Sequence, residues 1–576
     1  MDTDATYPPG APPSAAASPA AAPRRARRRR RRGLQAARGV VLVCAVTAST
    51  VAAGAAPARA QPGVPLPLVL QDDAEFLNRS PERVREHVEA ARNSGVQVVR
   101  VTASWSRIAP DPRARERPAG GFRPADPATY DPGAWAHLDL AVREAHRAGL
   151  RVLIDIAFWA PVWAVDGDAT DRERPRLRPD PGEYRAFSTA VARRYDGTRR
   201  GADGGELPRV DLYGTWNEPN HPAFLAPQWD PRDGGGFEAA SADVYRALHE
   251  AAAPAIRAAS PGAVVLLGNL TSIGGRDGEA GVPPLRFLRR LACVDDALRP
   301  VTDGACADFR PVRADGLAFH PYTRYATPGT PAEGRDRVQL GDQAKLQGQL
   351  RRLRDAGRIV LGEDPDVPAP VWLTEYGYEA REDDPYQPFT RADQARFVGW
   401  STYLAWRSPG VVSAAQFLLR DIEPAESGLP VGDRRRYRDW QSGVLDRTGA
   451  PKPAAAALAL PFWPRLVGAG ASRRLWVFAQ VRRGFGVRAI AVQRWDAAAG
   501  AWRPVVLRDC GAPRPGCGGP GRGDALTGPV RTDPQGVAVR SGPAVEAGAL
   551  RLLWRRSSGS WLAGPPIELR SDAPTG

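Results

Sequence analysis

Cysteine is scarce in this sequence, which contains only five among 576 residues. Cys44 lies in an N-terminal segment that we expect to be removed, which leaves Cys293, Cys306, Cys510 and Cys517. An even number of cysteines in an exported chain favours disulfides. The expected pairs are local, Cys293 with Cys306 and Cys510 with Cys517, and two buried free pairs are the alternative. No histidine stands at metal-ligand spacing beside either pair, so a zinc site is not expected.

Long apolar runs are also rare, and the one near the N-terminus, Val40–Ala56, is short for a membrane span. It follows a basic block from Arg24 to Arg32 and ends at Ala58-Arg59-Ala60, which has the pattern of a signal-cleavage site. We therefore interpret residues 1–60 as a disordered basic leader with an export signal, and we expect an extracellular protein. An uncleaved segment would instead anchor the protein to a membrane.

Acidic residues are outnumbered, since the formal net charge is +15. Residues 1–60 contain ten Arg and two Asp, a charge of +8, so the rest of the chain carries +7. Spread over more than 500 residues, that charge does not favour nucleic-acid binding. No nucleic-acid partner is therefore expected.

Apolar, β-branched runs alternate with helical patterns between residues 66 and 458. Helices are predicted to begin at Ser80-Pro81, Asp131-Pro132 and Asp180-Pro181, where an N-cap oxygen precedes a proline, and Thr390 caps a longer helix. Eight strand–helix units predict a (β/α)8 TIM barrel over residues 61–460. A doubly wound sheet is the rival fold, but no glycine-rich phosphate turn follows the first strand. The expected strands are Leu66–Gln71, Val96–Thr102, Arg151–Ala157, Val210–Thr215, Val264–Leu270, Gly316–His320, Val371–Thr374 and Val412–Leu418.

The pattern changes after Pro461, where short alternating runs are separated by Gly, Pro and Asp clusters. This pattern predicts a small C-terminal β-sandwich over residues 461–576. It resembles the Ig-like modules appended to bacterial extracellular proteins, mainly over Val487–Val506. The expected strands are Leu475–Val481, Val487–Trp495, Trp502–Arg508, Val537–Arg540 and Ala549–Trp554.

Carboxylates follow the fourth and seventh predicted barrel strands, at Glu218 and at Glu375. In a closed barrel the C-terminal ends of these two strands face each other across the mouth, where TIM-barrel chemistry takes place. Glycosidic cleavage needs such a pair, with one carboxyl protonated to assist the leaving oxygen and the other ionised. The sequence therefore predicts a glycosidase.

Two motifs, Trp216-Asn217-Glu218-Pro219-Asn220 and Thr374-Glu375-Tyr376-Gly377, resemble the paired signatures of clan A glycoside hydrolases, especially families 39 and 5. The resemblance covers roughly residues 66–458. It implies a retaining double displacement with Glu218 as acid/base and Glu375 as nucleophile, and with Asn217 on the sugar 2-hydroxyl. It implies no metal and no organic cofactor.

Other strand ends agree with the resemblance. His320 and Tyr322, in His320-Pro321-Tyr322, resemble substrate- and nucleophile-contacting groups of the clan, and Tyr322 is expected to donate to Glu375 and keep it ionised. Arg100, in the second strand, resembles the clan's arginine near the nucleophile. For both His320 and Arg100 the alternative is a structural role in the barrel core.

Aromatic residues offer possible sugar platforms. Trp105, Trp159 and Trp163 follow strands two and three and are expected either to stack on a pyranose or to fill the loop core. Asp72 and Asp73 end strand one and are candidates for hydroxyl contacts, and Asn269 ends strand five. Strand eight lacks the tryptophan usual in family 5, for which the substitutes considered are Gln416, Phe417 and Trp440.

The sequence thus predicts a secreted retaining glycosidase that acts on a β-linked oligosaccharide, polysaccharide or glycoside. One alternative is a catalytically decayed barrel that binds carbohydrate at the cell surface. Another is a transglycosylase with the same residues, which differs in whether water or a sugar accepts the glycosyl group.

Overall fold

A computed structural model describes residues 66–569, apart from 168–172, 233–234, 424–427, 431, 438–439, 485, 510–524 and 527–528. The export signal and the Cys510–Cys517 pair lie outside the described residues. Among the residues that the structure describes, no helix is long and apolar enough to cross a membrane.

Eight parallel strands form the predicted (β/α)8 barrel, in the order β11-β9-β7-β4-β3-β2-β1-β12. Backbone hydrogen bonds close the barrel between β11 and β12, from Val412 to Val371 at 2.9 Å and from Phe417 to Tyr376 at 2.8 Å. Each predicted strand is confirmed, with ends shifted by a few residues. The strands are β1 Leu68–Gln71, β2 Val98–Ser104, β3 Arg151–Ala157, β4 Leu212–Thr215, β7 Val264–Thr271, β9 Gly316–His320, β11 Val371–Leu373 and β12 Ala414–Phe417.

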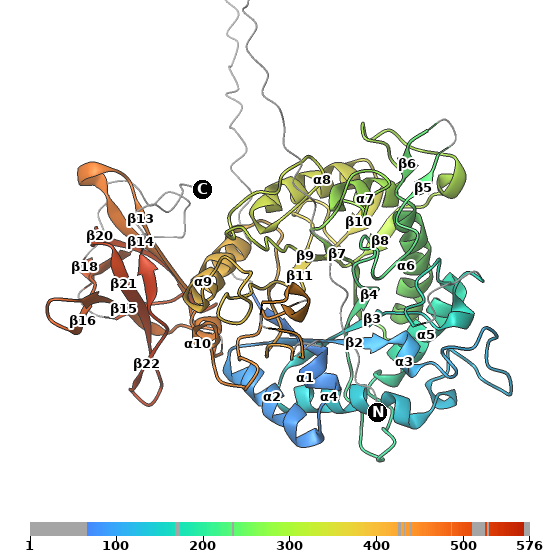
Figure 1. Ribbon diagram of the computed structural model, residues 1–576, viewed down its shortest axis with the longest axis horizontal. Helices are drawn as coiled ribbons and strands as arrows, with labels where there is room; N and C mark the ends of the chain where they lie inside the picture. The colour runs from blue at the N-terminus through green and yellow to red at the C-terminus, as the bar shows by residue number, and fades with distance from the viewer. Residues whose placement is uncertain are drawn as a thin grey trace, which may run out of the picture.

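Helices surround the barrel strands and begin at the predicted caps (Figure 1). The Asp180 side chain accepts from Glu183 N at 2.8 Å, and Thr390 makes a capping box with Asp393. At Asp131 a 3-10 turn, Pro132–Trp135, precedes α4. The helices are α1 Asp73–Leu77, α2 Pro81–Asn93, α3 Trp105–Ile108, α4 Ala136–Arg147, α5 Pro181–Arg194, α6 Ala240–Ala259, α7 Pro284–Leu291, α8 Gln343–Asp355, α9 Arg391–Arg407 and α10 Pro453–Ala459. Two small strand pairs lie outside the barrel sheet, β5 Asp230–Pro231 with β6 Phe237–Glu238 and β8 Val312–Ala314 with β10 Ile359–Leu361.

The barrel interior has an apolar lower layer and a polar upper layer. The lower layer takes one side chain from each of six strands: Val69, Val98, Leu153, Leu212, Leu266 and Ala318. Alternate residues of a strand point to the same face, so the residues two positions later lie in the next layer towards the C-terminal mouth. On four strands these are Gln71, Arg100, Asp155 and His320, all of them buried. The strands therefore place polar groups, including the charged pair Arg100 and Asp155, towards the mouth above an apolar layer.

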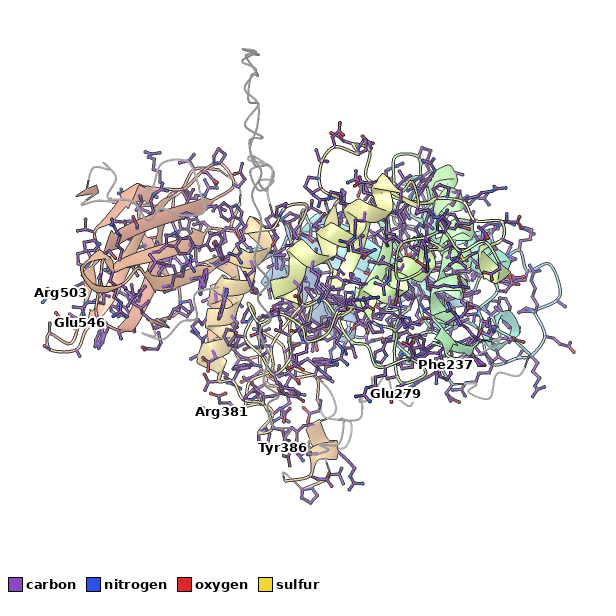
Figure 2. The ribbon with its side chains drawn as sticks, turned by 90° about the horizontal axis from the view of Figure 1, so that it is seen from above. Phe237, Glu279, Arg381, Tyr386, Arg503 and Glu546 are labelled. Carbon is purple, nitrogen blue, oxygen red and sulfur yellow. A yellow bond between two sulfur atoms is a disulfide. The ribbon has the colours of Figure 1, made fainter. Side chains whose placement is uncertain are left out.

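Two antiparallel sheets follow the barrel and lie beside α9 and α10 (Figure 1). Arg503 and Glu546 mark the end of this region that is distant from the barrel (Figure 2). The predicted strand content is confirmed, whereas the sandwich arrangement and the domain boundaries at 60 and 460 stay predictions. The strands are β13 Phe462–Val467, β14 Arg474–Gln480, β15 Ala489–Asp496, β16 Ala501–Pro504, β17 Leu507–Asp509, β18 Ala525–Leu526, β19 Val530–Arg531, β20 Val537–Pro543, β21 Gly548–Arg555, β22 Trp561–Ala563 and β23 Ile567–Leu569.

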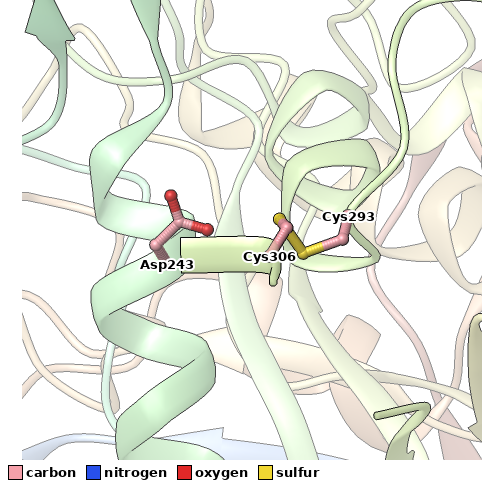
Figure 3. Close-up of side chains that lie close together, drawn as sticks. All are labelled: Asp243, Cys293 and Cys306. Atoms are coloured by element: carbon pink, nitrogen blue, oxygen red, sulfur yellow. A yellow bond between two sulfur atoms is a disulfide. The ribbon is translucent and has the colours of Figure 1, made fainter. Parts of the chain in front are cut away.

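Cys293 and Cys306 form the predicted disulfide, and Asp243 lies beside it (Figure 3). The three polar atoms are close enough to suggest a metal cluster. However, bonded sulfurs are not thiolates, and the thiolate is the form of cysteine that binds metal. Asp243 also pairs with Arg246 at 2.9 Å and with Arg290 at 2.7 Å. The cluster therefore has a structural role.

Candidate active site

Glu218 lies just beyond β4, on a segment with unusual backbone angles. Trp216 has φ of 65° and Glu218 has φ of 40°, values that residues other than glycine rarely adopt and that cost ~1–3 kcal/mol each. The neighbouring strand end, at Asn269, holds this conformation. Asn269 Nδ2 donates to the Trp216 carbonyl at 2.9 Å, and Glu218 N donates to the Asn269 carbonyl at 3.1 Å. The barrel therefore fixes the Glu218 backbone in a strained conformation, as is common at functional sites.

Arg100 is the centre of the buried charges below the mouth. Its guanidinium donates to Glu375 Oε1 at 2.5 Å, to Asp155 Oδ2 at 2.8 Å and to Asn217 Oδ1 at 2.7 Å. Arg100 and Asp155 are fully buried. A guanidinium that is held on several sides fixes the positions of its acceptors, because its donors form a rigid planar fork. Arg100 thus lies against Glu375, near which the resemblance expects an arginine, and also against Asn217.

His320 bridges the two glutamates at the mouth. Its Nδ1 lies 2.9 Å from Glu218 Oε1 and 3.5 Å from Glu375 Oε2. One polar atom from each of the three residues lies within 4.8 Å of the others. Tyr322 OH donates to Glu375 Oε2 at 3.1 Å. The structure therefore brings together the two glutamates, His320 and Tyr322.

The two carboxyl groups have different electrostatic surroundings. Burial, together with the negative charge of Glu375, raises the pKa of Glu218 to about 8. Burial raises the pKa of Glu375 as well, but Arg100 and the Tyr322 hydroxyl oppose that rise. Burial, with a further contribution from Arg100, lowers the pKa of His320 well below its usual value, so the ring is neutral. Burial and the charge of Glu375 thus favour the protonated form of Glu218, whose side chain keeps 12% exposure to solvent.

A cation in this cluster would meet Arg100, whose positive charge already lies against Glu375. Only two carboxylates and one imidazole are close enough to act as ligands there, among the residues that the structure describes. The positive charge of Arg100 therefore disfavours a metal ion in this cluster.

Sequence reasoning missed Asp155, which stabilises the site from β3. Its Oδ2 accepts from Arg100, and its Oδ1 accepts from Asn269 Nδ2 at 2.8 Å. Gly214 lies beside Asp155 in the strand register, and a Cβ there would come within 2.6 Å of the Asp155 carboxylate. The available signal was a carboxylate inside an otherwise apolar strand, because a buried charge has to be paired.

Trp440, one of the three substitutes considered for strand eight, lies against Tyr322, and its contact with a sugar stays a prediction. Its ring stacks on Tyr322 at a centroid distance of 5.3 Å and meets Phe417 edge-on at 5.9 Å. The guanidinium of Arg324 lies over the Trp440 ring at 5.1 Å. Gln416 was not a correct alternative, because its amide donates to the carbonyls of Phe417, Leu418 and Ser442.

A buried ion cluster anchors the loop that carries Trp440. Lys452 Nζ lies 2.7 Å from an Asp421 carboxylate oxygen and 2.8 Å from Asp383, and it donates to the Gln441 carbonyl at 3.3 Å. Lys452 and Asp421 are both buried. Gln441, beside Trp440, is therefore tied through Lys452 to Asp383, in the segment that follows β11 and carries Glu375.

The expectation that Trp105 contacts a sugar is wrong. Trp105 is 1% exposed, because α3 turns its ring onto Phe187 of α5, stacked at 5.7 Å. Trp163 packs edge-on against Trp105 at 6.3 Å, as in the loop-core alternative. Trp159 is half-buried, with its indole N–H donating to Ala223 O at 2.9 Å and Arg174 over its ring at 5.0 Å. A sugar contact by Trp159 stays a prediction.

Two other weak candidates also have structural roles. Asp72 is buried and caps α1 by accepting from Glu75 N, and its second oxygen accepts from Leu419 N at 2.9 Å. Asp73 Oδ1 accepts from Thr102 N at 3.1 Å. Both carboxylates therefore join neighbouring strand ends.

The fold and the site define an eight-stranded TIM barrel with two glutamates at opposite strand ends, and the fold agrees with the resemblance to clan A. No family model matches the sequence, and no curated protein matches it. Solved structures similar to this chain include a family 39 glycoside hydrolase from Bacteroides cellulosilyticus WH2, at 14% identity and a TM-score of 0.46, covering 84% of this chain and 81% of that one. A glucosidase from Croceicoccus marinus is similar at 13% sequence identity and a TM-score of 0.43, and the match covers 84% of this chain and 98% of that one. A GH5_18 protein from Streptomyces cattleya, in complex with GlcNAc, is similar at 18% sequence identity and a TM-score of 0.41. That match covers 70% of this chain and 79% of the other.

Proposed function

We propose that this protein is a retaining glycoside hydrolase that cleaves the O-glycosidic bond of a β-linked glycan or glycoside. The observation that carries the proposal is the closeness of Glu218, His320 and Glu375, since one carboxylate oxygen of each glutamate and one ring nitrogen of His320 lie within 4.8 Å of one another. Retaining glycosidases separate their carboxyl groups by ~5–5.5 Å, whereas inverting enzymes need ~6.5–9.5 Å to admit a water molecule. The short spacing therefore favours retention.

In the first step, the Glu375 carboxylate attacks the anomeric carbon and forms an ester bond to it. The glycosidic C–O bond breaks, and the leaving oxygen takes the proton of Glu218. In the second step, the Glu218 carboxylate takes a proton from water, whose oxygen attacks the anomeric carbon and releases the Glu375 carboxylate. Both residues return to their starting protonation states, so the cycle needs no further reactant.

The surrounding residues support these roles. Arg100 and Tyr322 both donate to Glu375 and favour its ionised form, whereas the negative charge of Glu375 helps to keep Glu218 protonated. Asn217 Oδ1 is held by Arg100. Its amide N–H groups would serve the sugar 2-hydroxyl, and Trp440 would face the apolar side of the ring.

Aryl β-glycosides and a panel of β-linked glycans test the proposal. The wild type should release product with the anomeric configuration retained, as followed by NMR, and a mechanism-based fluorosugar should label Glu375. Glu375→Gln should abolish turnover. Glu218→Gln should keep slow turnover of substrates with good leaving groups, and azide should accelerate that turnover by replacing water without needing a base. Inversion of configuration, or a label on Glu218, would overturn the assignment.

A transglycosylase would use the same first step, and adding a sugar acceptor to the same assay separates the two activities by their products. A decayed barrel would show no turnover with any substrate of the panel. We also propose that the protein is exported through residues 1–60. N-terminal sequencing of protein from a culture supernatant should find the mature chain beginning after Ala60.

A further inference from the structure

After the basic leader, the net positive charge of the chain lies in its C-terminal region. Residues 461–576 contain 17 Arg, no Lys and seven Asp or Glu, a formal charge of +10. Residues 61–460 contain 52 Lys or Arg and 55 Asp or Glu, a charge of −3. The interpretation of a diffuse +7 after the leader was therefore wrong, because an average over both parts hides their opposite signs. A region this basic attracts polyanions.

One sheet of this region, in the order β16-β15-β21-β22, has an apolar face and a solvent face. Ile490, Val492, Leu550 and Leu552 point to the first face and are buried. The alternate positions belong to the second face, since neighbouring residues of a strand point to opposite sides. The residues of this solvent face, which we call the tryptophan face, are Gln493, Trp495, Trp502, Arg551, Arg555 and Trp561.

The exposed tryptophans among the described residues lie on the tryptophan face, whereas the other exposed aromatic rings, Phe237, Tyr325 and Tyr386, belong to the barrel residues. All 16 tryptophans lie in described parts of the chain, and only Trp495 and Trp561 are exposed, at 40% and 42%. Two tryptophans on one solvent face beside arginines suit a ligand that has flat apolar surfaces, because burying their rings is favourable. The Arg551 guanidinium covers Trp502 at 4.2 Å, and two of its nitrogens donate to Gln493 Oε1 at 2.9 and 2.7 Å.

The strand register indicates an extended ligand. On the middle strand, Trp554 pairs with Ile490 of β15, and the next residue, Arg555, pairs with Trp561 of β22. Trp561 therefore lies level with Ala489, at the end of β15 opposite to Trp495. Trp495 and Trp561 are therefore about six residues apart along the strands and two strands apart across them, which corresponds to roughly 20 Å. Arg551 and Arg555 belong to the same face between or beside these two rings, and Arg531, paired with Ala489, extends it. A ligand long enough to contact both Trp495 and Trp561 therefore also passes over the guanidinium groups of Arg551 and Arg555.

We propose that the tryptophan face binds an anionic polysaccharide. The flat rings of Trp495 and Trp561 match the apolar C–H faces of sugar rings, and arginine pairs with carboxylate or sulfate groups through two parallel hydrogen bonds. The +10 charge of the region complements a polyanion. This binding site is separate from the barrel mouth and does not depend on hydrolysis there.

The test measures binding of the full chain to polygalacturonate, to chondroitin sulfate and to neutral glucomannan by affinity electrophoresis. The Glu375→Gln background prevents any turnover from consuming the ligand. We expect binding to at least one of the two anionic polymers, weakened by added salt, and weaker binding to glucomannan. In that background, the double change Trp495→Ala with Trp561→Ala should weaken the binding roughly tenfold. In the protein that keeps Glu375, the same double change should leave the turnover of a small aryl glycoside unchanged.

Phe237→Ala is the matched control, because Phe237 is exposed to a similar extent, 38%, but lies on the barrel (Figure 2). It should leave polysaccharide binding unchanged. An equal loss in this control, or no loss in the double tryptophan variant, would overturn the proposal. So would a failure to bind either anionic polymer, equal binding to glucomannan, or tighter binding to duplex DNA that displaces the polysaccharide.

Discussion

Replacing Tyr322 with phenylalanine removes a single hydroxyl group from the surroundings of Glu375. That hydroxyl donates to Glu375 Oε2 at 3.1 Å, and the ring itself stacks on Trp440 and would remain in place. A donor stabilises the ionised carboxylate, so its loss raises the pKa of Glu375. A hydrogen bond to a charged group contributes ~1.5–3 kcal/mol, which corresponds to about one to two pKa units.

The pH profile of kcat/KM measures this change on any aryl β-glycoside that the wild type hydrolyses. As the pH falls, Glu375 becomes protonated and can no longer attack, so activity is lost on the acid side. With a higher pKa, Tyr322→Phe should lose activity at a pH about one to two units higher than the wild type. The loss on the basic side, near the pKa of about 8 for Glu218, should move much less.

Tyr378→Phe is the control for Tyr322→Phe, because Tyr378 is also a buried tyrosine near the mouth. Its hydroxyl donates to Ala326 O at 2.7 Å and contacts Thr323, and neither glutamate is among its hydrogen-bond partners. This variant should keep the acid limb of the wild type. If Tyr322→Phe has the same acid limb as Tyr378→Phe, the hydroxyl does not control the charge of Glu375 and the reasoning is refuted.

Three further changes test Trp440 and the framework of the site. Trp440→Ala removes the ring beside Tyr322 and should raise KM several-fold more than it lowers kcat in steady-state assays, because a ring that binds substrate and transition state alike mainly affects KM. Lys452→Met leaves Asp421 and Asp383 buried without their shared cation, so the free energy of unfolding in urea should fall by about 3–5 kcal/mol. Cys293→Ser opens a loop with a sequence separation of 13 and should cost about 3 kcal/mol, measured as a lower Tm.

Each of these three changes has an internal comparison. Phe237→Ala removes an exposed ring elsewhere on the barrel and should leave KM unchanged. Lys345→Met removes the other lysine, which is bound to backbone carbonyls near the surface, and should cost far less than Lys452→Met. Cys306→Ser removes the other half of the same bond and should show the Tm of the Cys293→Ser variant. A Lys452→Met variant as stable as Lys345→Met would show that the ion cluster does not hold the loop.

The strand ends and helix starts could be predicted because their signals are local. Ser80-Pro81 and Asp180-Pro181 combine a cap oxygen with a proline that fits only the first helical turn, and both helices begin there. Glu218 and Glu375 follow apolar strands directly, so barrel topology alone was enough to bring them to one mouth. Local pattern and topology thus supplied the two residues on which the proposed chemistry depends.

The partners of these residues depend on strand register, which a single sequence does not reveal. In the pairing of β2 with β3, Thr102 lies opposite Asp155, so Arg100, two residues before Thr102, points to the same face as the Asp155 carboxylate. A shift of one residue would turn that carboxylate to the other face. Trp105 was misplaced for a related reason. Its position just after β2 suggested the mouth, but the short helix α3 turns the ring under Phe187, where burial of a large aromatic group is most favourable.

Charge was misread because it was averaged across two parts of opposite sign. The barrel residues carry −3 and the C-terminal residues carry +10, so added salt should affect the two parts differently. Turnover of a neutral aryl glycoside depends on buried groups such as Arg100 and Glu375, which ions in solution screen little. Polyanion binding to the tryptophan face involves exposed arginines and should weaken steeply with salt. Measuring both in one salt series separates the proposed active site from the proposed binding face, because a parallel decline of the two would mean that they are not independent sites.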